Sequence, residues 1–410
     1  MTQVMKGVRV LEVAQFTFVP AAGGVLADWG ADVLKIEHPK RGDAQRGLDV
    51  LQKVTINAQR NMLMQHPNRG KRSVGIDIYS DEGRELIYEL AKSCDVFLTN
   101  FLPAARKKLK IDVEDIRKHN PNIIYARGSA HGDKGPDREK GGFDASSFWA
   151  RGGSAMLTSP PELGGPLGQP GPAYGDSIGA MFIAGGISAA LFHRERTGEA
   201  VEMDVSLLSS GIWATACSVD IAMDIGASPF KAAMPGAESA GTNPFIGNFR
   251  CADGKYINLN VLTPGPYIRN TFERLHLPEL AEDPRFSTDL ELMKNAAEAR
   301  KFIVEAFGKH KFSHWIDRFQ TMTGQWAPFQ DPLDVGSDPQ VLANEFIFEV
   351  DPEDGSGRPL RLVANPVQFN HQPAKNTRAP EAWEHTELVL MEMGVEWERI
   401  EELKAKGAIA

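Results

Sequence analysis

The stretch VRVLEVAQFTFVPAAGGVLADWGADVLKIEHP (residues 8–39) decides the fold. Its opening residues, 8–13, form a short β-branched apolar run that is typical of a buried parallel strand. Pro20 suits the first turn of a helix, and Gly30 ends that helix. A second strand follows at residues 33–37, so the stretch predicts a β-α-β unit.

The alternation of strands and helices continues downstream. It predicts an α/β, Rossmann-like fold with a mostly parallel sheet that is covered on both faces. Ligands of such sheets bind beyond the carboxyl ends of the strands, so we expect the loops after Val13, Glu37, Leu98 and Gly128 to converge on one crevice. The G-x-G-x-x-G sequence is absent after the first strand, so a nicotinamide or flavin site is not supported. The further predicted elements are strands at residues 69–77, 95–98, 122–128 and 201–208 and helices at 81–92, 114–118 and 209–223.

The chain changes character at residues 226–248, which are rich in proline and loop-forming residues. A hairpin around Asp253-Gly254 follows and indicates a new unit. We therefore expect a large Rossmann-like domain at 1–225 that carries the ligand site, a small α+β domain at 226–330, and a return segment at 331–410 that completes the large domain.

Composition limits the partners of the protein. A net charge of −9 and a pI of about 5.7 argue against nucleic acid or an anionic membrane as a partner. Cys94, Cys217 and Cys251 are far apart and fit a reducing compartment. We expect no membrane span, because no segment reaches roughly 18 apolar residues in a row, and we expect a cytoplasmic location. His310 and His314 could share a metal ion on one helix face, but no third ligand lies near them in the sequence, so no metal site is predicted.

Asp176 is the main candidate for chemistry, because it lies between a glycine- and proline-rich loop and an apolar helix that ends near Gly198. One interpretation makes it the N-cap of that helix, and another makes it a catalytic carboxylate. The sequence GDSIG (175–179) also fits the nucleophile elbow G-x-S-x-G, with Ser177 as the nucleophile of a serine hydrolase. The elbow requires a preceding strand, which the loop before it cannot form, and no persuasive Asp and His pair follows downstream. The hydrolase remains an alternative.

Basic side chains gather in the loops after the predicted strands. On an acidic protein this clustering indicates an anionic, phosphorylated small ligand, although such side chains also commonly do no more than face water. They include His38, Lys40, Arg41, Arg46, Arg106, Lys108, Lys134, Arg138 and Lys140.

Several ordered motifs cover nearly the whole chain. Together they resemble those of the family III coenzyme A transferases, which include formyl-CoA and carnitine CoA-transferases and have α-methylacyl-CoA racemase as a relative. The motifs are GVRVLEV (7–13), LADWGADVLKIEHP (26–39), NRGKRSVGID (68–77), NPNIIYARGS (120–129), HRERTGEAVEMDVSLL (193–208) and IGNFRCADGKYINL (246–259).

The resemblance implies that Asp176 is the catalytic carboxylate of a CoA-transferase. Its carboxylate would attack an acyl-CoA thioester, form a mixed anhydride and then an aspartyl-CoA thioester, and pass coenzyme A to a carboxylic acid. Coenzyme A and acyl-CoA are then substrates, and no tightly bound cofactor is expected. Glycine-rich segments hold the oxyanion in this family, which makes Gly152, Gly153 and the neighbourhood of Gly247 candidates.

The resemblance also implies a coenzyme A site. His38 and Lys108 stand where some relatives have arginine, so their phosphate contacts would be single rather than bidentate. Thr17 stands where one branch carries glutamine, which leaves the acyl-side contacts open. The implied residues are Gln15, Phe16, His38, Ile76 to Tyr79, Asn100, Phe101, Lys108 and Lys140.

One position helps to separate transfer from racemisation. Racemases of this type place a histidine where this chain has Phe143, followed by Asp144. The absence of a second base at this position favours transfer. Racemisation would require His131, in the preceding loop, to act as the second base.

The resemblance further implies an interlocked homodimer, for which an ordinary globular homodimer is the alternative. A non-catalytic coenzyme A or nucleotide-binding protein, in which Asp176 only caps its helix, is the third reading of function.

Overall fold

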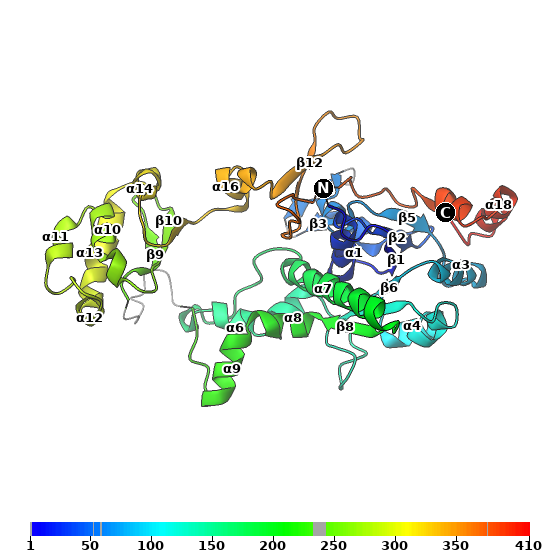
Figure 1. The fold of residues 1–410 in the computed structure, drawn as a ribbon, viewed down its shortest axis with the longest axis horizontal. Helices are drawn as coiled ribbons and strands as arrows, with labels where there is room; N and C mark the ends of the chain where they lie inside the picture. Colours follow the sequence, from blue (N-terminus) through cyan, green and yellow to red (C-terminus); the bar gives the residue numbers. More distant parts are fainter. Residues whose placement is uncertain (1, 52, 58–59, 233–242, 375) are drawn as a thin grey trace. The chain divides into compact units, whose positions relative to one another are not determined.

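The chain divides into two compact units, one formed by residues 1–231 and 339–410 and the other by residues 232–338 (Figure 1). Both ends of the chain therefore contribute to the larger unit. The boundaries predicted from the sequence are 225/226 and 330/331. The structure is a computed structural model, which describes residues 2–51, 53–57, 60–232, 243–374 and 376–410.

A six-stranded parallel sheet forms the centre of the larger unit. Its strand order is β5-β2-β1-β6-β7-β8, so successive strands are added first on one side of β1 and then on the other. In this register Leu11 on β1 pairs with Leu34 on β2 and with Phe97 on β6. The strands are β1 (Arg9–Val13), β2 (Asp32–Glu37), β5 (Arg72–Gly75), β6 (Val96–Thr99), β7 (Ile124–Ser129) and β8 (Glu202–Ser206).

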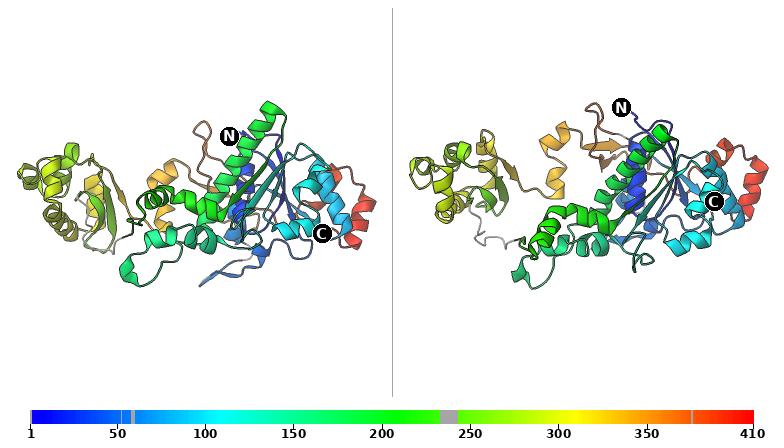
Figure 2. Two further views of the ribbon diagram at one scale, coloured as in Figure 1. Left: turned by 90° about the horizontal axis from the view of Figure 1, so that it is seen from below. Right: turned by 60° about the horizontal axis from the view of Figure 1, so that its bottom comes forward.

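Helices cover both faces of this sheet, because the strands are apolar on both sides. Val10 packs into the core under α1 (Phe18–Asp28) and α7 (Tyr174–Thr197), the long helix that crosses one face in Figure 2. Leu11, its neighbour in the strand, points into the opposite core. That core is closed by α3 (Asp81–Lys92), α4 (Pro103–Leu109), α5 (Val113–Arg117), α17 (Thr386–Glu392) and α18 (Trp397–Ala405).

The end of the chain returns to the edge of the sheet. Ile409 forms a bridge with Ile76, and the backbone N–H of Ala410 donates to the carbonyl of Gly75 at 3.2 Å. The remaining elements of the larger unit are β3 (Val50–Leu51), β4 (Val54–Thr55), α2 (Met62–Asn68), a π-helix at Ala145–Ala150, α6 (Ser154–Thr158), α8 (Leu207–Ala214), α9 (Ala216–Ile225), α16 (Pro339–Ala343), β12 (Ile347–Val350) and β13 (Leu360–Val363).

The smaller unit packs helices on an antiparallel sheet of order β11-β10-β9. The expected turn at Asp253-Gly254 joins β9 to β10. In this antiparallel pair Phe249 lies opposite Ile257. Its core is rich in phenylalanine around the fully buried Trp315. The elements are β9 (Ile246–Arg250), β10 (Tyr256–Asn260), α10 (Ile268–Arg274), α11 (Pro278–Glu282), α12 (Asp289–Lys294), α13 (Ala296–Lys309), α14 (Phe312–Phe319), β11 (Trp326–Pro328) and α15 (Pro332–Val335). The predicted fold class, an α/β large domain with a smaller α+β domain, is confirmed.

Two expectations about helices were wrong. The single helix predicted at residues 209–223 is interrupted at Thr215, whose hydroxyl donates to the carbonyl of Gly152 at 3.0 Å. Helix α7 is also long and apolar enough to cross a membrane, with a mean hydropathy of 1.4 over its best window. Its alanines and glycines extend the apolar stretch beyond the large side chains. Length and composition are weak evidence for a membrane, because the core helices of globular proteins pass the same test, and α7 packs its buried face on the sheet and α1.

Candidate active site

The loops that follow β1 and β6 meet at the carboxyl edge of the sheet. The backbone N–H of Gln15 donates to Asn100 Oδ1 at 3.1 Å, and Asn100 Nδ2 donates back to the carbonyl of Gln15 at 2.7 Å. The direction in which strands are added reverses at β1, and this is the place where open α/β sheets bind ligands. The predicted convergence of these two loops is therefore present.

A buried ionic group holds the first of these loops in place. Asp43 Oδ1 accepts a hydrogen bond from the backbone N–H of Phe16 at 3.1 Å, and Phe16 has the left-handed value φ 65°. Lys35 Nζ lies 2.7 Å from Asp43 Oδ2 and 3.3 Å from Glu12 Oε1, with all three side chains fully buried. Burial opposes the charge of Lys35, but Asp43, Glu12 and Glu37 outweigh it and raise the pKa of this amine.

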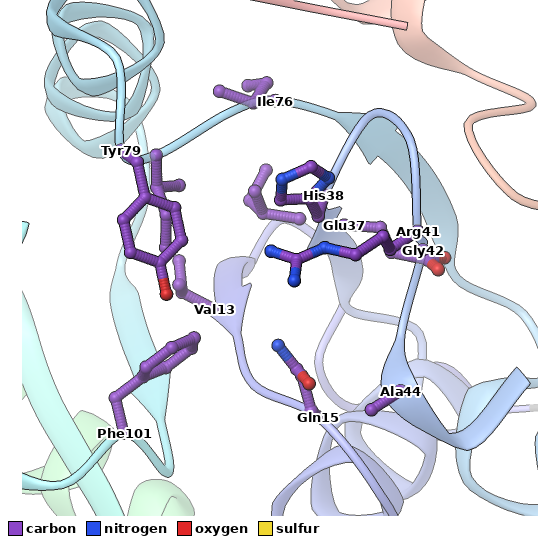
Figure 3. A pocket seen from close by; sticks show the side chains of 12 residues that line it. Val13, Gln15, Glu37, His38, Arg41, Gly42, Ala44, Ile76, Tyr79 and Phe101 are labelled. Carbon is purple, nitrogen blue, oxygen red and sulfur yellow. The ribbon is translucent and has the colours of Figure 1, made fainter. Parts of the chain in front are cut away.

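The first cavity lies beyond β1, β2 and β5 and has a volume of about 340 Å³. It brings together six residues of the implied coenzyme A site, which are Gln15, His38, Ile76, Ile78, Tyr79 and Phe101. Figure 3 shows the guanidinium group of Arg41 pointing into the cavity between His38 and Gln15, with Tyr79 and Phe101 on the opposite wall.

His38 is held as a neutral side chain in this cavity. Its pKa is lowered by partial burial and by the charge of Arg41. Nδ1 accepts a hydrogen bond from the backbone N–H of Lys40 at 3.1 Å, which leaves Nε2 as the donor. Trp383 Nε1 fixes the backbone by donating to the His38 carbonyl at 3.0 Å.

The second cavity lies beyond β1, β6 and β7 and has a volume of about 610 Å³. Gln15 and Phe101 line it as well as the first cavity, so the two are neighbours. Asp176 lines the second cavity together with Phe16 and Asn100. The other lining residues are Phe18, Leu102, Ala105, Gly128, Ser129, Ala130, Gly141, Gly142, Phe143, Ser146 and Leu207.

Asp176 lies in the first turn of α7, but it does not cap the helix. The N-cap residue is Ala173, and the carboxylate of Asp144 accepts the backbone N–H of Gly175 at 3.0 and 3.1 Å. Across the described residues, no group donates a hydrogen bond to the Asp176 carboxylate in this structure. Burial, followed by the charge of Asp144, raises the pKa of Asp176 to about 7. A carboxylate this poorly solvated is a stronger nucleophile than one in water.

Glycine is required next to Asp176 because α7 begins in close contact with its neighbours. A Cβ atom on Gly175 would lie 2.2 Å from Phe148 Cγ and 2.5 Å from Asp144 Oδ1. Any side chain here would displace the aspartate that binds the end of the helix.

Ser177 is in contact with a histidine that the sequence did not reveal. Its Oγ lies 3.0 Å from Nε2 of His66, which precedes it in the chain, whereas the sequence search for a partner considered histidines downstream. Burial and the charge of Arg69 lower the pKa of His66 to about 4. Asp28, the nearby carboxylate, is bound to Arg69 at 2.7 Å. Asp28 therefore does not orient His66, and Asp176 rather than Ser177 is in the described lining of the second cavity, so the pair does not form the triad of a hydrolase.

Of the glycines proposed for an oxyanion site, Gly152 and Gly153 are absent from the described lining of the Asp176 cavity, and Gly247 belongs to the smaller unit. Gly152 packs against Gly211, where an added Cβ would come within 2.8 Å of the Gly211 Cα, and Gly247 faces Arg300 in the smaller unit. Gly141 and Gly142 line the cavity with Asp176 instead. The signal for them in the sequence is a pair of adjacent glycines in the segment that follows β7.

Three of the implied coenzyme A residues, Asp77, Lys108 and Lys140, are outside both cavities as described. Lys108 is exposed on α4, and Lys140 is exposed and pairs with Asp137 at 2.6 Å. Arg41, which the sequence placed only among the basic loop residues, faces the first cavity instead.

Phe143, which the resemblance places where racemases have a histidine, lies in the wall of the second cavity. It is 64% exposed, lines the cavity and packs edge-on against Phe16 at 5.5 Å between ring centroids. Nδ1 of His131 lies 3.4 Å from Arg151 Nη1, and the described cavity lining does not include His131.

The chain is similar to known proteins over nearly its whole length. The model of CoA-transferase family III matches residues 5–386. The (R)-2-hydroxy-4-methylpentanoate CoA-transferase of Clostridioides difficile is 28% identical, over 98% of each chain. The cinnamoyl-CoA:phenyllactate CoA-transferase of Clostridium sporogenes is 29% identical, over 98% of this chain and 96% of its own.

Solved structures are similar over the same extent. A CAIB/BAIF family protein from Brucella suis superimposes with a TM-score of 0.78 at 26% sequence identity. The match covers 96% of this chain and 100% of the Brucella chain. A crystal structure from Mycobacterium tuberculosis has a TM-score of 0.76 at 27% identity, over 98% of its chain and 93% of this one.

Proposed function

The chain belongs to CoA-transferase family III, and we propose that it transfers coenzyme A through covalent intermediates on Asp176. The observation that carries this proposal is the Asp176 carboxylate itself. It faces the larger cavity, lacks a hydrogen-bond donor among the described residues, and has a pKa raised to about 7. Asp144 binds the end of α7 in its place, so Asp176 is free to react.

The chemistry proceeds in four balanced steps. A carboxylate oxygen of Asp176 attacks the thioester carbonyl, the C–S bond breaks, and a mixed anhydride and coenzyme A thiolate result. The thiolate attacks the aspartyl carbonyl, which releases the donor acid and leaves an aspartyl-CoA thioester. The acceptor carboxylate then attacks this thioester and expels the thiolate. The thiolate finally attacks the acceptor carbonyl and regenerates the free Asp176 carboxylate. No proton needs to be transferred, so a general base is not required.

The two neighbouring cavities suggest how coenzyme A is bound. We place its charged nucleotide end in the first cavity, where Arg41 and His38 offer donors to phosphate. The pantetheine arm then passes Gln15 and Phe101, which line both cavities, and brings the thioester to Asp176 in the second.

The second cavity favours an apolar acyl group. Among the described residues its lining includes the aromatic side chains of Phe16, Phe18, Phe101 and Phe143 and no lysine or arginine. A second carboxylate on the acyl chain would therefore lack a cationic partner. We propose donors and acceptors with branched or aromatic side chains, such as those named for the Clostridioides difficile and Clostridium sporogenes relatives, in preference to dicarboxylates.

We also propose that the protein is cytoplasmic and that it forms a homodimer. Large apolar side chains exposed on α8 and α9 support association, since Trp213 and Met223 are each 71% exposed and Ile225 is 54% exposed. Sedimentation of the purified chain tests the dimer.

Substitution of the aspartate tests the catalytic role. Asp176→Asn keeps the shape of the side chain but cannot attack, so we expect coenzyme A transfer to fall on the order of 10³-fold or more with every donor. Ser177→Ala is the matched control on the next residue and should keep most of the activity. Initial rates with arylacyl-, branched 2-hydroxyacyl- and succinyl-CoA donors measure both effects and the acyl preference. A Ser177→Ala variant that is inactive while Asp176→Asn turns over would instead support a hydrolase.

A further inference from the structure

Three histidines from separate segments meet in the smaller unit. His276 follows α10, His310 follows α13, and His314 lies in α14. One ligating nitrogen of each lies within 4.8 Å of those of the others, and Nε2 of His276 is 2.9 Å from Nε2 of His314. The rings of His310 and His314 stack with centroids 4.1 Å apart. The third ligand that the pair at 310 and 314 lacked in the sequence is therefore supplied by the fold.

We propose that His276, His310 and His314 form a binding site for a divalent transition-metal ion, with Zn²⁺ as the physiological occupant. Three imidazoles are a ligand set that Zn²⁺ accepts, with water in the remaining position. At metal–nitrogen distances of about 2.0–2.1 Å, two ligands at a right angle are about 2.9 Å apart and two at a tetrahedral angle about 3.4 Å apart. The separation between His276 and His314 already falls at the lower of these values.

The backbone around each histidine is held by contacts outside the cluster. His276 has φ 62°, a left-handed conformation that turns the chain back toward α14 after α10 ends. Arg318 on α14 donates from Nε to the carbonyl of Arg274 at 2.6 Å, which fixes the distance between the two helices. The backbone N–H of Ala252 donates to the carbonyl of His310 at 2.9 Å. The backbone that carries the three histidines is thus held by contacts that do not depend on a metal, which lowers the entropic cost of binding.

Trp315 provides a rigid floor for the cluster. It is fully buried, and its ring centroid lies 5.8, 5.4 and 5.2 Å from those of His276, His310 and His314. The positive charge of the neighbouring Arg318 opposes a cation, so we expect micromolar rather than nanomolar affinity.

The site joins α10, α13 and α14, so its expected role is to stabilise the smaller unit. It is independent of the coenzyme A chemistry, because none of its ligands lines either cavity described above. Zinc should raise the midpoint of thermal unfolding, and the rise should grow with the logarithm of the zinc concentration once that concentration exceeds the dissociation constant.

Zinc titration of the full-length chain tests the proposal. The protein is used without a histidine tag, stripped with a chelator, and carries Cys217→Ser, because the exposed thiol of Cys217 could bind zinc by itself. We expect one equivalent of Zn²⁺ to be withdrawn from a chromogenic chelator, and Co²⁺ to give visible absorption bands of nitrogen ligation. His314→Gln should weaken binding at least about tenfold and abolish the thermal shift, since a neutral amide is a poor zinc ligand. His193→Gln, the same change on helix α7, should have no effect.

A measurement on the unsubstituted histidines makes the test independent of variant folding. Zinc should protect His276, His310 and His314 together from diethylpyrocarbonate, as mapped by peptide mass spectrometry. The proposal would be overturned if zinc protected other histidines instead, or if His314→Gln bound zinc as tightly as the unsubstituted protein. It would also be overturned if less than one equivalent of zinc were bound at about 100 µM added metal, a concentration well above a micromolar dissociation constant.

Discussion

Asp176 combines burial with freedom from hydrogen bonds, which is unusual for an ionisable group in the first turn of a helix. Aspartate at such a position ordinarily accepts the free backbone N–H groups. Here Asp144, which is 31 residues earlier in the chain, accepts the N–H of Gly175. The charge of Asp144 also raises the pKa of Asp176. One residue thus frees the nucleophile and tunes it.

The raised pKa predicts a pH dependence for the first acyl transfer. Only the ionised form of Asp176 attacks, and its pKa is about 7. kcat/KM should therefore be constant at alkaline pH and fall about tenfold per unit below pH 7. Asp144→Asn removes the like charge, lowers the pKa of Asp176 and should move this acid limb to lower pH.

The acid limb of kcat/KM is measured in the unsubstituted enzyme and in Asp144→Asn between about pH 5.5 and 9, roughly two units on either side of the pKa. Glu195→Gln, which neutralises an exposed carboxylate near the end of α7, is the control and should leave the limb in place. A limb that does not move in Asp144→Asn, or that moves to higher pH, would contradict the coupling of the two aspartates.

The loop after β1 depends on a buried ion pair rather than on its own sequence. Phe16 is held in a left-handed conformation by Asp43, and Asp43 is neutralised by Lys35. The pairing connects three elements of the larger unit, β1 through Glu12, β2 through Lys35 and the turn that contains Asp43. The position of Gln15 and Phe16 in the two cavities follows from it.

Removal of the buried amine should destabilise the larger unit. Lys35→Met leaves the carboxylate of Asp43 buried without its cation, so we expect the free energy of unfolding to fall by about 3–5 kcal/mol. Lys309→Met removes an amine from the exposed pair with Glu305 and should cost less than about 1 kcal/mol. Urea unfolding followed by circular dichroism compares them. Equal effects of the two changes would refute the role of the buried group.

Elements with a strong apolar pattern were predictable from the sequence. The strands β1, β2, β6 and β7 appear within two residues of their predicted bounds, because each is buried on both faces and bounded by loops. The break at Thr215 was not predictable, since it depends on a hydrogen bond to Gly152 from a distant segment.

At the scale of the whole molecule, the rule that ligands bind at the carboxyl ends of parallel strands located most of the site. It predicts that the loops after β1, β2 and β6, which contain Gln15, His38 and Asn100, converge at one edge of the sheet, and these residues line the two cavities. The rule does not say which side chains fold back from later loops. The contacts of Asp144 with Gly175, of His66 with Ser177 and of His276 with His314 each join segments at least 31 residues apart, so no local pattern reveals them.

The division of the chain separates chemistry from the second proposed site. Asp176 and both cavities belong to the unit formed by residues 1–231 and 339–410, and the histidine cluster belongs to residues 232–338. Loss of zinc should therefore lower stability without removing the nucleophile, whereas loss of Asp176 should leave zinc binding intact.

The most direct test of the account is mass spectrometry of the enzyme trapped during turnover. The protein is mixed with an acyl-CoA donor that it demonstrably uses, quenched with hydroxylamine or borohydride, and digested. The account predicts a modified peptide that carries the change on Asp176 and is absent from Asp176→Ala. A modification on Ser177, or turnover without any trapped change on Asp176, would contradict covalent catalysis by this aspartate.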